Sequence, residues 1–255
     1  MSLHAIRPAP DADPVAEIRR HLAAAHRMAV LDGLDEGIDN HFTVELPERP
    51  GQYLILPFGR HWSEARASEM MVFDESGRTL EGEGEVELSA QCIHGPLHRI
   101  TGARVVLHTH QTWALALNML QHNRLLPATQ TASFFYGQIA YDDEYTGVAA
   151  SLAEGERLAA VIGDKPILFM KNHGVVATGA TIAQAYRRLY KLERACRTQV
   201  LALSTGQPIE VLGEEVIARV QTPGADERHP RVERERLYFE AMMRVVDREL
   251  PGYAD

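Results

Sequence analysis

The sequence predicts an α/β fold in which helices cover both faces of a β-sheet. Stretches with apolar residues at three- and four-residue spacing alternate along the chain with short β-branched and aromatic runs. The 255 residues can form one sizeable core, and 45% hydrophobic with 24% charged residues is typical of a globular protein. We therefore expect a single α/β/α layered domain over residues 14–255, ending in a helical extension, after a flexible tail at 1–13.

The first half of the chain contains a long helix, several short strands and a second helix. Val15, Ile18 and Leu22 recur at helical spacing, and Gly33 ends this first helix, which spans about residues 15–31. Further elements, in order, are expected as strands at 42–46, 53–56 and 71–73, a strand or loop at 79–80, a helix at 89–99 and a buried strand at 105–110.

The second half alternates in the same way. Expected elements are a helix at 112–120, a functional loop with a short strand within 125–145, a helix at 154–162, and strands at 166–171 and 175–178. A long helix with Thr181 as its N-cap follows to about residue 203, and an amphipathic helix covers 231–250.

Charge and cysteine content limit the partners and the compartment. A formal net charge of −9 disfavours a nucleic-acid surface, which needs clustered Lys and Arg. The two cysteines, Cys92 and Cys196, leave one disulfide open but do not make a secreted disulfide scaffold. No segment has the apolar length of a signal peptide or membrane span, so we expect a cytoplasmic protein without a membrane partner.

Three of the twelve histidines are spaced as metal ligands. His108 and His110 are alternate residues at a strand end, so their side chains share a face with Cα atoms roughly 6.5–7 Å apart. His173 follows a buried run, and Gly174 allows close backbone approach. The alternatives are a surface pair for the first two and a turn residue for His173. Together the three predict a ligand set with an open coordination position, as in catalytic zinc sites.

The other histidines divide into three groups. His94 and His98 lie one helical turn apart, and we expect His94 to pack or hydrogen-bond beside the ligands and His98 to be exposed. His41 and His61 are candidates for substrate contact. The remaining histidines are interpreted as incidental: His4, His21, His26, His122 and His229.

Four segments in this order resemble the class II aldolase/adducin family. They are Asn40-His41-Phe42-Thr43, Ile55-Leu56-Pro57-Phe58-Gly59, Val106-Leu107-His108-Thr109-His110, and Asn172-His173-Gly174 with Val175-Val176-Ala177-Thr178-Gly179. Their order and spacing agree with the family over about residues 15–205. Residues 55–67 and 138–145 most closely resemble the bacterial, adducin-like branch of the family.

The resemblance implies an α/β/α sandwich around a mixed, largely antiparallel sheet, and a homotetramer with sites at subunit boundaries. It places the family's metal ligands on His108, His110 and His173, with Zn²⁺ expected and Mn²⁺ or another divalent cation as alternatives. Substrate contacts are then expected from Asn40, His41, Phe58, Gly59, Arg60, His61 and Ser89.

Two departures from the family bear on function. Ala90 and then Gln91 stand where aldolases carry an acid, and neither exchanges a proton. The phosphate pocket has lost hydrogen-bond donors, with Asp39, Phe58 and Leu88 at positions where the family has small residues, and a dianion needs several donors. A sugar-phosphate aldolase is therefore disfavoured.

The expected activity is that of a metal-dependent carbon–carbon lyase acting on a small carboxylate or aromatic acid through a metal-stabilised enolate. Aldol cleavage needs a base, for which Tyr136, Tyr141, Tyr145 and Glu87 are open candidates. Decarboxylation needs no base in the bond-breaking step. The alternative from another class is a non-catalytic, metal-stabilised adducin-like binding or scaffold protein, and an epimerase is a weaker third.

Overall fold

The computed structural model describes residues 13–222 and 230–255, and the strands in these ranges form one eight-stranded sheet. The strands are β1 (His41–Glu45), β2 (Gln52–Ile55), β3 (Met71–Asp74), β4 (Thr79–Glu81), β5 (Val105–Thr109), β6 (Ile139–Asp142), β7 (Ile167–Met170) and β8 (Gly174–Gly179). Their order across the sheet is β4-β3-β2-β1-β5-β8-β7-β6. Neighbours are antiparallel except β6 and β7, which are parallel. The expectation of a mixed, largely antiparallel sheet is confirmed.

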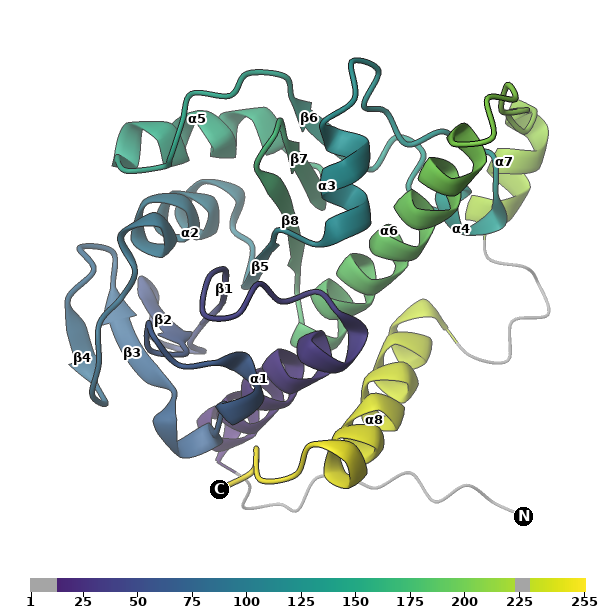
Figure 1. Cartoon of the computed structure of the whole chain (residues 1–255). Helices are drawn as coiled ribbons and strands as arrows, with labels where there is room; N and C mark the ends of the chain where they lie inside the picture. Colours follow the sequence, from purple (N-terminus) through teal and green to yellow (C-terminus); the bar gives the residue numbers. More distant parts are fainter. Residues whose placement is uncertain (1–12, 223–229) are drawn as a thin grey trace, which may run out of the picture.

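Helices cover both faces of this sheet (Figure 1). One face carries α2 (Leu88–Thr101) and α5 (Leu152–Ile162), and the other carries α1 (Pro14–Asp32), α3 (Thr112–Asn118), α6 (Ile182–Leu203) and α8 (Arg231–Glu249). Alternation along β5 explains the two layers, because Val106 packs with α2 and α5 while Val105 and Leu107 pack in the core on the opposite face. The α/β/α sandwich is therefore confirmed.

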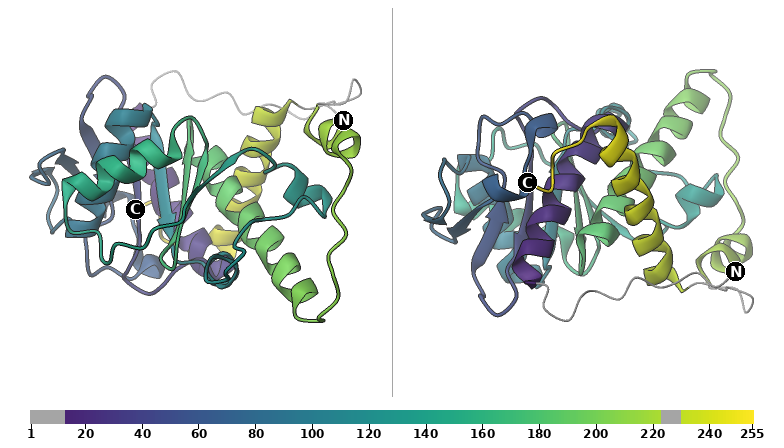
Figure 2. Two further views of the ribbon diagram at one scale, coloured as in Figure 1. Left: turned by 90° about the horizontal axis from the view of Figure 1, so that it is seen from above. Right: turned by 90° about the horizontal axis from the view of Figure 1, so that it is seen from below.

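The C-terminal half of α6 extends beyond the sheet together with two short helices, α4 (Gln130–Ser133) and α7 (Glu214–Gln221) (Figure 2). The sequence patterns did not indicate α7, because Ile217 is its one buried residue and a helix with so narrow an apolar face has little periodicity. Two 3₁₀ helices, Trp62–Glu64 and Ala67–Glu69, were also not predicted.

Most other elements begin and end close to their predicted limits. Thr181 is the N-cap of α6, and its side chain accepts a hydrogen bond from the Gln184 amide at 3.1 Å. Cys92 and Cys196 are free thiols on helices that cover opposite faces of the sheet, which removes the disulfide alternative. The predicted tail lies, except for Asp13, outside the described residues. Among the helices of the described residues, none combines the length and apolar character that crossing a bilayer requires.

A buried arginine holds the segment between β2 and β3 in place. Arg27 is 4% exposed, and its guanidinium donates to the carbonyls of Glu64 and Ala65 on that segment and to those of Leu250 and Pro251 after α8. The C-terminal residues add two backbone hydrogen bonds to the same segment, at Ala67 and Ser68. This segment lines the site described next, so its packing fixes one wall.

Candidate metal centre

His108, His110 and His173 come together at one end of the sheet. The first two stand at the end of β5, and His173 lies in the turn between β7 and β8. Their candidate ligand atoms lie within 4.8 Å of one another, and each pair of ring centroids is 4.9 Å apart. The antiparallel pairing of β5 with β8 brings the two segments side by side. No ion is part of the structure, so the donor set itself has to show whether a cation fits.

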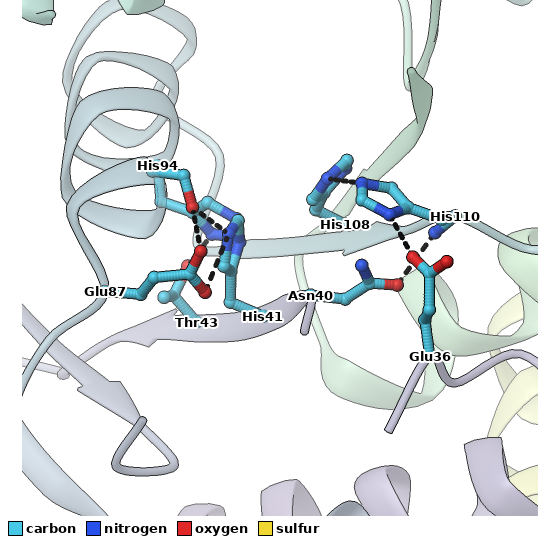
Figure 3. Close-up of polar contacts among 9 residues, drawn as sticks. Glu36, Asn40, His41, Thr43, Glu87, His94, His108 and His110 are labelled. Atoms are coloured by element: carbon cyan, nitrogen blue, oxygen red, sulfur yellow. Dashed lines mark hydrogen bonds and ion pairs between the residues drawn. The ribbon is translucent and has the colours of Figure 1, made fainter. Parts of the chain in front are cut away.

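Two rings are each held by a hydrogen bond on the side away from the other ring, and Figure 3 shows the one between His110 and Glu36. The His108 Nδ1–H donates to the Val175 carbonyl at 3.0 Å, and the His110 Nδ1–H donates to the Glu36 carboxylate. In neutral rings both Nε2 atoms then carry lone pairs, and these atoms are 3.2 Å apart. Two facing lone pairs repel, whereas an ion at ~2.0–2.1 Å from each is the arrangement found in zinc sites.

Burial favours the neutral form of the His108 and His173 rings, which is the form that binds a metal. Desolvation holds the pKa of His108 well below its ordinary value, and repulsion from His173, His41 and His110 lowers it further. Desolvation, followed by repulsion from His110, lowers the pKa of His173 to about 4. The donor set therefore fits a divalent cation at neutral pH.

Gly174 leaves room for the imidazoles. A Cβ at this position would lie 2.6 Å from the Thr109 carbonyl oxygen, 2.8 Å from His110 Cδ2 and 3.2 Å from His108 Cε1. The first two separations are shorter than any ordinary van der Waals contact. Only glycine therefore allows the β7–β8 turn to approach β5 this closely.

A second polar group adjoins the three histidines. His41 is the register partner of His108, and the two ring centroids are 5.1 Å apart. The His41 Nε2 lies 3.0 Å from the Ser89 Oγ, and the Ser89 hydroxyl donates to the Glu87 carboxylate at 2.7 Å. Because Glu87 is the N-cap residue of α2, the start of that helix carries both residues to the sheet.

Asn40 contributes a buried donor without a partner. Its backbone has a φ of 76°, and its Oδ1 accepts a hydrogen bond from the His110 amide at 2.8 Å. Its Nδ2 is buried and, among the described residues, meets no acceptor. An unpaired buried N–H costs about 1–3 kcal/mol, so this atom suits a ligand oxygen.

A small recess opens beside this group, with a volume of about 10 Å³, room for about one water molecule. It therefore takes one functional group of a ligand, and the remainder of the ligand has to lie outside. Of the residues expected to contact substrate or act as base, five line it: Asn40, His41, Phe58, Arg60 and Glu87. Gly59 lies in the same turn with a φ of 86°, and Ser89 reaches the recess through its hydrogen bond to His41.

Other expected residues lie apart from the recess. His61 accepts a hydrogen bond from the Ser63 amide and caps a 3₁₀ helix. The Tyr136 side chain is exposed, and its backbone carbonyl accepts a hydrogen bond from Gln221 of α7. Tyr145 is also exposed, and the Tyr141 hydroxyl accepts from the Leu125 amide. Among the four candidate bases, Glu87 is the one that lines the recess.

Histidines outside the ligand set also differ from expectation. His94 does hydrogen-bond beside the ligands, with its Nε2 2.7 Å from the His41 Nδ1. The expectation that His98 is exposed was wrong, because it is 2% exposed on the buried side of α2, where it contacts Thr43 of β1. His26 is not incidental, since it is buried and lines the recess. His4 and His229 lie outside the described residues.

Sequence reasoning did not single out Thr43 and Glu36. Thr43 is fully buried and contacts both His94 and His98. It stands two residues after His41 on β1, so strand alternation was a signal that it shares the His41 face. Glu36, which orients His110, lies in an irregular loop and leaves no such pattern.

Comparisons with known proteins show to which family the chain belongs. The family model described as "Class II Aldolase and Adducin N-terminal domain" matches residues 20–200. The chain is 32% identical over 246 residues to a protein of Caulobacter vibrioides that is named as an aldolase class 2 protein. The match covers 94% of this chain and 92% of that protein. It is 29% identical over 215 residues to the decarboxylase NovR of Streptomyces niveus, covering 82% and 79%.

A solved structure extends the agreement to three dimensions. The aldolase II superfamily protein from Pseudomonas syringae superposes with a TM-score of 0.86 at 31% identity, covering 96% of this chain and 98% of that chain. The family model alone spans well over half of the sequence. The protein therefore belongs to the class II aldolase and adducin family.

Proposed function

We propose that this protein is a metal-dependent carbon–carbon lyase acting on a small carboxylate or aromatic acid. The observation that carries the proposal is the convergence of three imidazoles beside a recess with an unpaired donor. The similarity to a decarboxylase supports carbon–carbon bond cleavage as the reaction class. Aldol cleavage and decarboxylation share one requirement, which is stabilisation of an enolate.

His108, His110 and His173 would hold the ion, for which Zn²⁺ is the first choice and Mn²⁺ the second. When bound, it supplies Lewis-acid stabilisation of the negative charge that develops on the substrate. Glu36 orients the His110 ring by accepting a hydrogen bond from its Nδ1–H, and the Val175 carbonyl does the same for His108. Such supporting hydrogen bonds orient metal-binding rings and keep the required tautomer.

The chain's own groups bind and orient the substrate. Asn40 Nδ2 offers a hydrogen bond to an oxygen placed in the recess. Arg60 can meet a carboxylate, since its side chain is 52% exposed and its partner Glu69 is 3.3 Å away at the surface of the segment. Phe58 adds exposed apolar surface at the recess, which favours an aromatic or aliphatic acid.

Glu87 is the one of the four candidate bases that lies at the recess. Its carboxylate lines the recess and is 30% exposed, and it has no arginine or lysine partner among the described ion pairs. The same negative charge, next to Phe58, opposes a phosphate dianion. These features support a carboxylate in place of a sugar phosphate.

The test is turnover by the purified chain loaded with Zn²⁺ and, separately, with Mn²⁺. A panel of hydroxy acids, keto acids and aromatic carboxylates is screened for released carbon dioxide and released aldehyde, with His108→Ala as the matched control. Carbon dioxide identifies a decarboxylase, and an aldehyde identifies an aldolase. A chain that binds the ion stoichiometrically and converts no member of the panel would overturn the proposal.

That outcome would favour a second candidate, a non-catalytic metal-stabilised binding protein. Ala90 supports this second candidate, because it stands where the family has an acid and its side chain is fully buried. Retention of fold on metal removal separates the two further, because a purely structural ion would be needed for folding. We also propose that the chain forms a homotetramer in the cytoplasm, which light scattering and cell fractionation test.

A further inference from the structure

A continuous string of buried hydrogen bonds runs from the recess into the core between β1, β5 and α2, and Figure 3 shows the part that contains His41, His94 and Thr43. The His41 Nδ1 lies 2.7 Å from the His94 Nε2, and the His94 Nδ1 lies 2.5 Å from the Thr43 Oγ1. The Thr43 Oγ1 is 2.8 Å from the His98 Nε2, and the His98 Nδ1 is 2.6 Å from the Ala103 carbonyl. All four side chains are at most 5% exposed, so water does not complete their hydrogen bonding.

The Ala103 carbonyl sets the direction of the string, because a carbonyl oxygen can only accept. The His98 Nδ1 must therefore carry its proton. The three rings are at most 5% exposed, and among the described residues no carboxylate lies within hydrogen-bonding distance of their nitrogens, so each ring is neutral and has one N–H. The opposite direction would place the His98 lone pair against the carbonyl lone pairs.

The positions of the other protons in the string follow once the His98 proton is placed on Nδ1. The Thr43 hydroxyl donates to the bare His98 Nε2, which is nearer than its other acceptor, the Val106 carbonyl at 3.3 Å. The Thr43 oxygen then accepts from the His94 Nδ1–H, and the His94 Nε2 accepts from the His41 Nδ1–H. As a result the His41 Nε2 carries a lone pair.

At the recess end of the string, two acceptors compete for the hydroxyl proton of Ser89. Its one hydroxyl proton faces two acceptors, the Glu87 carboxylate at 2.7 Å and the His41 Nε2 at 3.0 Å. The hydrogen bond to the charged and nearer carboxylate is the stronger. The His41 Nε2 is thus left without a donor at the wall of the recess.

We propose that Thr43, His94 and His98 are positioning residues that fix His41 as the Nδ1–H tautomer, so that its Nε2 lone pair accepts a hydrogen bond from a substrate hydroxyl in the recess. The Asn40 Nδ2 donor and this acceptor would then receive the same ligand group from two sides. The inference rests on the proposed function only for the identity of the hydroxyl-bearing ligand. The tautomer itself is a property of the protein and needs no turnover.

The test is the imidazole tautomer of His41, read from long-range ¹⁵N–¹H correlation spectra of the full chain and assigned by the resonances lost in His41→Gln. The decisive pair is Thr43→Val and Thr43→Ser, because valine matches the shape of threonine without the hydroxyl. In Thr43→Val the His94 Nδ1–H would be an unpaired buried donor, whereas reversed tautomers let His41 Nε2–H donate to Ser89. We expect Nδ1–H in the native chain and in Thr43→Ser, and a shift of the proton to Nε2 in Thr43→Val.

Ser89→Ala keeps the inference testable if Thr43→Val does not fold. This substitution removes the Ser89 hydroxyl beside the His41 Nε2 and leaves Thr43, His94 and His98 unchanged. His41 should therefore remain the Nδ1–H tautomer. Spectra recorded with Zn²⁺ added and after chelation should agree, since the anchor is the Ala103 carbonyl. An Nε2–H tautomer in the native chain, an unchanged Thr43→Val spectrum, or a tautomer change in Ser89→Ala would overturn the proposal. None of these readings depends on whether the protein is a lyase.

Discussion

His41 and His108 face each other across β1 and β5 as register partners, with ring centroids 5.1 Å apart. Their nitrogens have different surroundings. His108 shares its cluster with His110 and His173, whereas both nitrogens of His41 lie beside other side chains, His94 and Ser89. On the proposals made above, these two adjacent rings serve two sites, one for the ion and one for the substrate. Variants at the two positions should separate metal binding from chemistry.

His108→Ala should abolish stoichiometric metal binding, because two imidazoles leave too few protein ligands for a stable site. His41→Ala should retain the metal and lower kcat by about a hundredfold, the effect expected on losing a hydrogen-bonding group at the reacting centre. Elemental analysis after gel filtration measures the first and steady-state kinetics the second. Stoichiometric metal in His108→Ala would refute the ligand assignment, and metal loss in His41→Ala would refute the division of roles.

Gly174→Ala should weaken metal binding without unfolding the chain. The added methyl would press on His110 Cδ2 at 2.8 Å and on the Thr109 carbonyl at 2.6 Å, so the turn and the rings must move apart. Gly95→Ala is the matched control, since a Cβ there meets nothing within 4 Å in mid-α2, and it should stabilise by about 0.5–1 kcal/mol. Competition with a chromogenic chelator gives both affinities. Equal affinities would contradict the role of Gly174.

The local sequence pattern was sufficient to predict the strands and the ligand pair. Alternation of His108 and His110 at the end of an apolar run needs only the two-residue period of a strand. The same period could have shown that Thr43 shares a face with His41, a signal that was missed, but no local pattern shows that His98 contacts Thr43 from α2, 55 residues later. The exposure of His98 was mispredicted because its helix has one polar and one buried side, and packing on the sheet decides which side it joins.

The recess was not predictable from local pattern. His26 comes from α1, Trp62 from the segment after β2, and Glu87 from the start of α2, so tertiary packing alone brings them together. The position of Arg27, which ties two distant segments, likewise carries no periodic signal. The family resemblance supplied Asn40 and Ser89, and the structure adds which atom of each is available.

Ala90→Glu should lower the melting temperature and should not raise turnover. The Ala90 side chain is fully buried in an apolar cluster with Tyr53, Ile55, Met71 and Phe73, and no cation lies among them to pair with a carboxylate. An unpaired buried charge costs several kcal/mol, which corresponds to a decrease in Tm of about 10 °C in a chain of this size.

Leu88→Glu is the control for that substitution. Leu88 is 56% exposed in the first turn of α2, where a negative charge interacts favourably with the helix N-terminus. Its Tm should equal or slightly exceed that of the native chain. Thermal unfolding followed by circular dichroism measures both variants. A faster enzyme from Ala90→Glu would show that the position faces the substrate after all.

The last prediction concerns His26, a neutral base in the core whose titration should make stability depend on pH. Its ring packs between Phe42 and Trp62, its Nδ1–H donates to the Leu22 carbonyl at 2.8 Å, and burial lowers its pKa to about 4. The unfolded ring takes up a proton below about pH 6.5, but the folded ring stays neutral until about pH 4. The unfolded state therefore binds more protons in this window, and the free energy of unfolding should fall as the pH is lowered through it.

His26 alone should contribute a change on the order of 3 kcal/mol between pH 6.5 and 4. Other buried histidines titrate in the same window, so the measurement has to be a difference between the native chain and His26→Phe, which keeps an aromatic ring against Trp62. Urea unfolding is followed from pH 4.5 to 7.5 with chelator present, because metal release would add its own pH dependence. The variant should have a shallower slope than the native chain below pH 6.5 and a parallel curve above it. Identical slopes would mean that the His26 ring takes up its proton equally in both states, which burial of the ring between two aromatic side chains opposes.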